Sequence, residues 1–143
     1  MNWLIDDAHL GEHLRTGRRP WGTRSTDQLF STGYWYVRLC QALLGVARRG
    51  VLSGPFDDLS PTQSQKVFAA IVELPQHVGM LSLRDLAPVM GRLRSDYELN
   101  VLSSEALAAA SVLNAHVLLS ASSPRLQTAL VSEGLRVIEH PVA

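Results

Sequence analysis

The chain has 143 residues, 46% hydrophobic and 18% charged, a balance typical of one globular domain that buries a full core. Its thirteen basic and thirteen acidic residues cancel, so binding to nucleic acid or to a membrane would have to come from a local patch. The single cysteine, Cys40, excludes a disulfide framework and a thiolate zinc site. No apolar run reaches the roughly 18 residues of a membrane-spanning helix, and Asp6 and Asp7 follow too soon after the start for a signal peptide. We therefore expect a cytoplasmic protein.

The first part of the chain predicts two strands and two helices joined by a long loop. In order, these are a strand over residues 1–5, a helix over 8–14, a loop over 16–26, a strand over 28–31 and a helix over 33–49. Tyr36, Leu39 and Leu43 fall at helical spacing and give the second helix an apolar face. Gly50 is expected to end that helix.

The middle of the chain predicts two further helices and one strand. In order, these are a turn-rich connection over 51–59, a helix over 61–74, a strand over 77–81 and a helix from about 85 to 95. Ser60, Pro61 and Gln63 have the pattern of a capping box with proline at the first helical position. The last of these helices is expected to start near residue 85, because a proline such as Pro88 is tolerated only in the first turn.

The last part of the chain predicts the closing half of a parallel sheet. In order, these are a helix over 103–113, a strand over 117–119, a helix over 124–133 and a strand over 135–138. Ser103 and Ser104 are expected to cap the first of these helices, with Glu105 in its first turn, and Asn114 to end it. Gly134 ends the second. The whole order predicts a three-layer α/β/α domain with a central five-stranded parallel sheet, in which ligands bind beyond the carboxyl ends of the strands.

The loop over residues 16–26 holds three arginines and a tryptophan, namely Arg18, Arg19, Arg24 and Trp21. Arginine side chains contact phosphates, and aromatic faces stack on bases, so these residues are candidates for binding RNA. The alternative interpretation is a solvated loop that its tryptophan fixes to the domain.

Four short segments, spread from one end of the chain to the other, carry a recognisable pattern. Leu4-Ile5-Asp6-Asp7-Ala8 ends the first strand with an aspartate, and Ser104-Glu105-Ala106-Leu107 leads into an alanine-rich helix. Leu118-Leu119-Ser120-Ala121-Ser122 leaves the fourth strand, and Gly134-Leu135-Arg136-Val137 enters the fifth. In their order and spacing these segments resemble the PIN domain, a family of metal-dependent nucleases.

The resemblance implies a site of three or four carboxylates around one or two magnesium or manganese ions, which activate water and neutralise charge on phosphate. Asp6 matches the first acidic position, and Glu105 stands where the family usually has an aspartate. Arg38 and Ser122 fall at the other two positions, so two of the four acids are missing. We expect Arg38 to lie within reach of Asp6 or Glu105 and to take the place of the cation. Alternatively, Asp6 and Glu105 are helix caps and Arg38 is an exposed helical arginine.

Two functions are consistent with these residues. The favoured one is a catalytically degenerate PIN-like domain, with no cofactor, that binds RNA or a partner protein and forms a homodimer. The alternative is a magnesium- or manganese-dependent endoribonuclease, the toxin of a bacterial toxin–antitoxin pair with an antitoxin-like partner. A receiver domain is rejected, because no aspartate follows the third strand and Lys66 is the only lysine. The five histidines show no metal-ligand spacing.

Overall fold

The computed structural model describes residues 1–47 and 60–142, and its centre is a five-stranded sheet in which every strand is parallel to its neighbours. The strands are β1 (Asn2–Ile5), β2 (Gln28–Phe30), β3 (Val78–Gly79), β4 (His116–Leu119) and β5 (Val137–Glu139). Their spatial order is β3-β2-β1-β4-β5, which makes β1 the central strand. The predicted sheet is confirmed, with strand ends within two residues of those expected.

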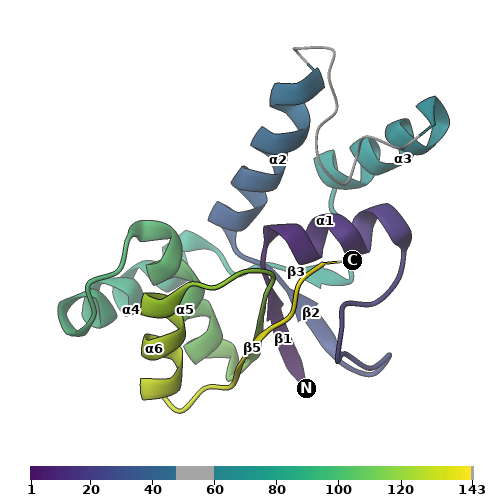
Figure 1. Cartoon of the computed structure of the whole chain (residues 1–143). Helices are drawn as coiled ribbons and strands as arrows, with labels where there is room; N and C mark the ends of the chain where they lie inside the picture. Colours follow the sequence, from purple (N-terminus) through teal and green to yellow (C-terminus); the bar gives the residue numbers. More distant parts are fainter. Residues whose placement is uncertain (48–59, 143) are drawn as a thin grey trace.

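Six helices connect the strands within the described residues (Figure 1). They are α1 (Asp7–Thr16), α2 (Gly33–Ala47), α3 (Pro61–Val72), α4 (Leu83–Asp96), α5 (Val101–Leu113) and α6 (Pro124–Ser132). In Figure 1, α4, α5 and α6 lie together on one side of the sheet, and α1, α2 and α3 lie on the other. This arrangement is the predicted three-layer α/β/α architecture.

Side chains of the central strands point alternately into two hydrophobic cores. Leu4 and Val117 pack with residues of α4, α5 and α6, whereas Ile5 and Leu118 pack with residues of α1, α2 and α3. This alternation follows from the two-residue period of a strand. All four of these side chains are completely buried, so both faces of the sheet are covered.

Three helix ends follow the chemistry that the sequence predicts. Ser60 and Gln63 form a capping box at the start of α3. Asn114 ends α5 in the left-handed conformation, with φ of 48°. Gly134 follows α6 with φ of 76°, a value that glycine adopts without a steric penalty.

Two helices begin earlier than predicted. The cap of α5 is Asn100, whose side chain accepts a hydrogen bond from the backbone N–H of Ser103 at 2.8 Å. Glu105 therefore lies in the second turn of α5 instead of the first. Ser82 caps α4 in the same way, which places Pro88 in the second turn of that helix. The predicted helix end at Gly50 and the connection over 51–59 lie outside the described residues.

Candidate functional site

Asp6 lies at the carboxyl edge of the sheet, directly after β1, and is only 6% exposed. One carboxylate oxygen accepts a hydrogen bond from the backbone N–H of His9 at 3.0 Å, which makes Asp6 the cap of α1. The other oxygen accepts from the backbone N–H of Ser120 at 2.7 Å and from its hydroxyl at 2.6 Å. Ser120 is the first residue after β4. Of these three charge-assisted bonds, one caps α1, and the other two tie the junction of β1 and α1 to the end of the neighbouring strand.

Glu105 is completely buried, and its carboxylate caps a different helix from its own. Its two oxygens accept hydrogen bonds from the backbone N–H groups of Gly33 at 3.1 Å and Tyr34 at 2.7 Å, the first two residues of α2. The hydroxyl of Thr32 accepts from the third, the N–H of Trp35, at 3.1 Å. The first three N–H groups of α2, which have no partner within the helix, thus each have an acceptor. The partial positive charge at this end of α2 also faces the carboxylate of Glu105.

Gly33 is the residue that lets Glu105 approach. A Cβ atom at position 33 would lie 3.1 Å from a carboxylate oxygen of Glu105, which is tighter than ordinary van der Waals contact. The start of α2 is therefore shaped to receive this side chain from α5.

Arg38 pairs with Asp7, and this corrects the prediction that it would reach Asp6 or Glu105. Its Nε lies 3.3 Å from a carboxylate oxygen of Asp7, and its side chain is 55% exposed. Burial raises the pKa of Asp7 above the ordinary 3.8, the charge of Arg38 works against this rise, and the charge of Asp6 adds to it. No cation is needed at Glu105, because the start of α2 supplies the donors there. The alternative interpretation of Arg38, an exposed helical arginine, agrees with the structure.

Ser122 is exposed in the loop between β4 and α6. The serine that contacts Asp6 is Ser120, two positions earlier. The sequence identified the segment that follows β4 as part of the site, but it did not identify Ser120 as the residue that contacts Asp6.

The residues at the carboxyl edge do not fit the magnesium or manganese site that the PIN resemblance implies. Such ions favour six oxygen ligands in octahedral geometry, and several of these ligands are usually waters. Three donors from the protein already hold Asp6, and Glu105 is sealed from solvent with both oxygens bonded to amides. Within the residues that the structure describes, no three His, Cys, Asp or Glu side chains lie close enough together to hold an ion. Both acids are positioned as helix caps.

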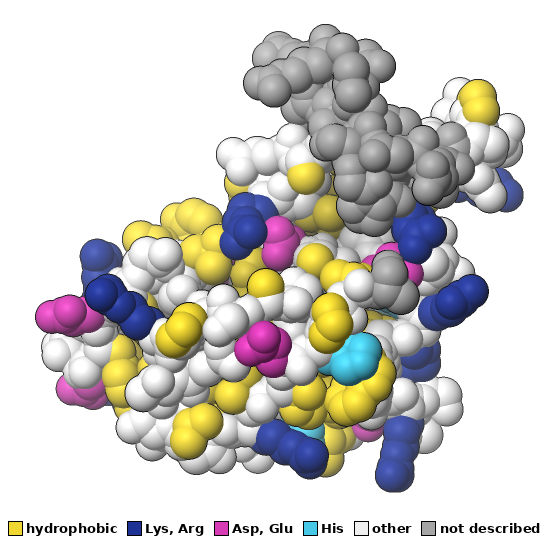
Figure 2. All heavy atoms as spheres, in the orientation of Figure 1, with side chains coloured by type: hydrophobic (Ala, Val, Ile, Leu, Met, Phe, Trp, Pro, Cys, Tyr) yellow, Lys and Arg dark blue, Asp and Glu magenta, His cyan; other side chains and the backbone are white. Residues whose placement is uncertain are grey.

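The arginine-rich loop lies at the opposite, amino edge of the sheet, between α1 and β2. Arg18 and Arg24 are exposed, and Trp21 is 50% exposed while its indole stacks on the ring of His140, with centroids 4.6 Å apart. Arg19 differs, because its guanidinium donates to the carbonyl of Asp27 at 2.8 Å and braces the loop. Figure 2 shows arginine side chains standing out on the side of the molecule where Figure 1 places the amino terminus and this loop.

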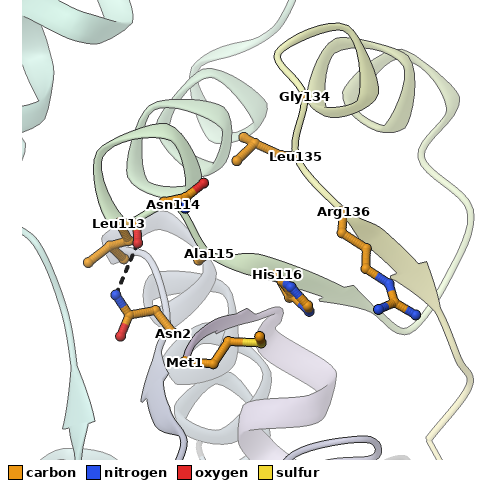
Figure 3. A pocket seen from close by; sticks show the side chains of 9 residues that line it. All are labelled: Met1, Asn2, Leu113, Asn114, Ala115, His116, Gly134, Leu135 and Arg136. Atoms are coloured by element: carbon orange, nitrogen blue, oxygen red, sulfur yellow. Dashed lines mark hydrogen bonds between the residues drawn. The ribbon is translucent and has the colours of Figure 1, made fainter.

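Two hollows lie along the amino edge, and one of them borders this loop. One has a volume of about 430 Å³ and includes Trp21 and Arg24 in its lining. The other, drawn in Figure 3, has a volume of about 650 Å³. They share Met1, His116 and Arg136, and Figure 3 shows the Arg136 side chain extending from the start of β5 toward the level of His116.

The electrostatics of this edge are positive around His116. Its pKa is lowered, first because burial disfavours the charged ring and next because Arg136 is near. Sequence reasoning missed both residues as site candidates. His116 begins β4 and Arg136 precedes β5, and only the parallel pairing of these strands brings them together.

Two histidines that are far apart in the sequence also meet. The Nε2 atoms of His13 and His77 are 2.7 Å apart, and Nδ1 of His13 lies 2.7 Å from the carbonyl oxygen of Arg18. In the neutral pair, His13 donates from Nδ1 to that carbonyl and accepts from His77. The pKa of His77 is lowered by burial and by the proximity of His13, which favours this neutral arrangement.

No model of a known protein family matches the sequence, and no curated protein resembles it significantly. Among the helices in the described residues, none has the length and apolar character needed to cross a membrane. The two edges of the sheet are therefore the basis for a functional assignment.

Proposed function

We propose that the protein is a PIN-like domain that lacks metal-dependent nuclease activity and binds RNA through the loop around Trp21. The buried Glu105 carries the first half of this proposal. A carboxylate that is closed to solvent and bonded to two amides of α2 is unsuited to hold a hydrated ion. Asp6, whose carboxylate already accepts three hydrogen bonds from the protein, supports the same conclusion.

The exposed side chains of the loop support the second half. Trp21 presents half of its surface to solvent, and Arg18 and Arg24 stand exposed on either side of it in the sequence. Proteins that bind single-stranded nucleic acid combine cations for the phosphates with aromatic faces for the bases. The neutral chain as a whole gives no such attraction, so a local group of this kind would have to supply it.

Thermal unfolding with and without 1 mM manganese tests the metal part of the proposal. An ion bound to the native state with a Kd near 10 μM would add about 2.7 kcal/mol at this concentration. That corresponds to a rise in Tm of roughly 5–11 °C for a domain of this size. We expect no such rise. Micromolar manganese binding by calorimetry, together with RNA cleavage that Asp6→Asn abolishes, would contradict the proposal and restore the nuclease.

Fluorescence anisotropy with a labelled single-stranded RNA tests the binding part. Affinity is expected to fall steeply between 50 and 200 mM salt, because phosphate contacts release counterions. Arg18→Gln and Arg24→Gln should each reduce the slope of log K against log salt by about 0.7 for every phosphate contact removed. Arg125→Gln is the matched control, because Arg125 is exposed on α6 at the other edge of the sheet. Absence of RNA binding at 50 mM salt would end this part of the proposal.

A further inference from the structure

The hollow beside Trp21 has the size and lining of a nucleotide site. Its volume of about 430 Å³ lies within the range of small-molecule pockets, which is roughly 300–1,000 Å³. Its lining includes three aromatic rings, of Trp3, Trp21 and His116, and two arginines, Arg24 and Arg136. The aromatic rings suit the flat face of a base, and the arginines suit a phosphate.

Contacts within the protein hold the aromatic rings of the hollow in place. Trp3 is 5% exposed and packs edge-on against His116, with centroids 5.1 Å apart. Gly22 rests on the Trp3 ring so closely that a Cβ atom there would lie 3.2 Å from it, and its φ of 78° suits glycine. Trp21 is held by its stacking on His140, yet half of its surface stays open. A base that stacks on a fixed ring loses less freedom on binding than one that must order a mobile side chain.

The charges of the hollow favour an anion. Arg24 and Arg136 are both exposed, whereas the one carboxylate in the lining, that of Asp27, is already engaged. Asp27 accepts a hydrogen bond from the backbone N–H of Arg24 at 2.7 Å, and the amino group of Met1 lies 3.5 Å from it. The bond from Arg24 is the main reason why the pKa of Asp27 is lowered.

We propose that this hollow holds one nucleotide of a single-stranded RNA, with the base on the open face of Trp21 and a phosphate at Arg24 and Arg136. The second hollow, about 650 Å³, shares Met1, His116 and Arg136 with the first and offers space for a neighbouring nucleotide (Figure 3). Arg136 is the cation that both hollows share, so it is the residue placed to contact the phosphate between them. This inference rests on the proposed RNA binding and assigns it to a specific pocket.

Four variants separate stacking from charge. Trp21→Ala should weaken binding of a ten-residue oligouridine by at least about fivefold, since each stacked base contributes that much or more. Trp21→Phe should restore most of the affinity, because it keeps an aromatic face. Arg136→Gln should weaken binding and lower the salt slope by about 0.7, whereas Arg136→Lys should keep the slope. Arg125→Gln again serves as the control.

Anisotropy of the labelled oligouridine gives these affinities, and quenching of tryptophan fluorescence by uridine monophosphate tests the free nucleotide. Quenching that Trp21→Phe removes places the nucleotide at Trp21, and binding of the oligomer at least tenfold tighter than the mononucleotide identifies RNA as the ligand. Tighter binding of the mononucleotide than of the oligomer would overturn the RNA assignment. Oligomer binding that ignores both Trp21→Ala and Arg136→Gln would overturn this inference and leave the proposed RNA binding standing. Absence of oligomer binding would overturn the proposed function itself.

Discussion

Replacement of Glu105 by glutamine removes the charge from the buried carboxylate and nearly preserves its shape. One amide of α2 would keep an oxygen acceptor, while the other would face the NH₂ group of the new side chain. Hydrogen bonds to a charged acceptor contribute about 1.5–3 kcal/mol, and a buried donor without a partner costs about 1–3 kcal/mol. We therefore expect Glu105→Gln to lower the free energy of unfolding by roughly 2–4 kcal/mol, because Glu105 holds the N–H groups of both Gly33 and Tyr34. This is a large share of the 5–15 kcal/mol typical of a domain.

Urea denaturation followed by circular dichroism measures this loss. With a slope of about 2 kcal/mol per molar urea, the middle of the usual range, the midpoint should fall by about 1–2 M. Glu98→Gln is the matched control, because Glu98 is exposed and the same chemical change there should stay within about 0.5 kcal/mol.

A metal-ligand role for Glu105 predicts the opposite pattern. Removal of one of two neighbouring acids would leave the metal-free protein as stable as before, or more stable, and manganese would cease to stabilise it. An unchanged urea midpoint for Glu105→Gln would thus refute the capping role.

Four other substitutions test further parts of the structure. Arg38→Ala should cost no more than about 1 kcal/mol, because the Arg38 side chain is more than half exposed in its pair with Asp7. NMR titration should show the pKa of Asp7 rising further once the cation that lowers it is gone. Since the pKa of Asp7 lies above 3.8 in the folded protein, stability is lost as pH rises through it, and Asp7→Asn should remove this component from a series of denaturation curves. Pro88→Ala should raise the free energy of unfolding by about 1–2 kcal/mol in urea, because it restores an N–H inside α4. Gly22→Ala should lower it by about 1–2 kcal/mol in the same assay, because of the positive φ.

Local chemistry was sufficient to predict most of the fold. The capping box at Ser60 and the left-handed Asn114 depend on residues only a few positions away, so the sequence displays them directly. Local rules failed where two signals competed. Ser103 and Ser104 have the side chains of caps, but Asn100 starts α5 one turn earlier. Pro88 led to the prediction that α4 starts near residue 85. Its ring is exposed, however, and the helix accommodates it in the second turn.

The long-range hydrogen-bond partners of Asp6 and Glu105 could not be predicted from neighbouring residues in the sequence. Ser120 lies 114 positions from Asp6, and the amides that meet Glu105 lie more than 70 positions from it. These contacts depend on how α5 packs against the start of α2, which periodicity does not specify. One signal was present: Glu105 is the only charged residue in an otherwise small and apolar helix, so burial and a need for donors could have been predicted for it. Gly33, at the start of α2, is the corresponding signal in the partner helix, because a glycine there leaves room for a side chain to approach.

The two edges of the sheet differ in how completely their polar groups are satisfied, and this difference indicates the kind of ligand. At the carboxyl edge, the charges of Asp6 and Glu105 are met by hydrogen-bond donors of the protein itself. A cation would have to displace bonds that stabilise two helix starts, and the loss would offset much of what it gained. At the amino edge, Arg24 and Arg136 reach solvent beside the open face of Trp21, so an anion with an aromatic group meets groups that are ready to bind it. This difference between the edges supports the proposed binding of a nucleotide at the edge opposite to the acids.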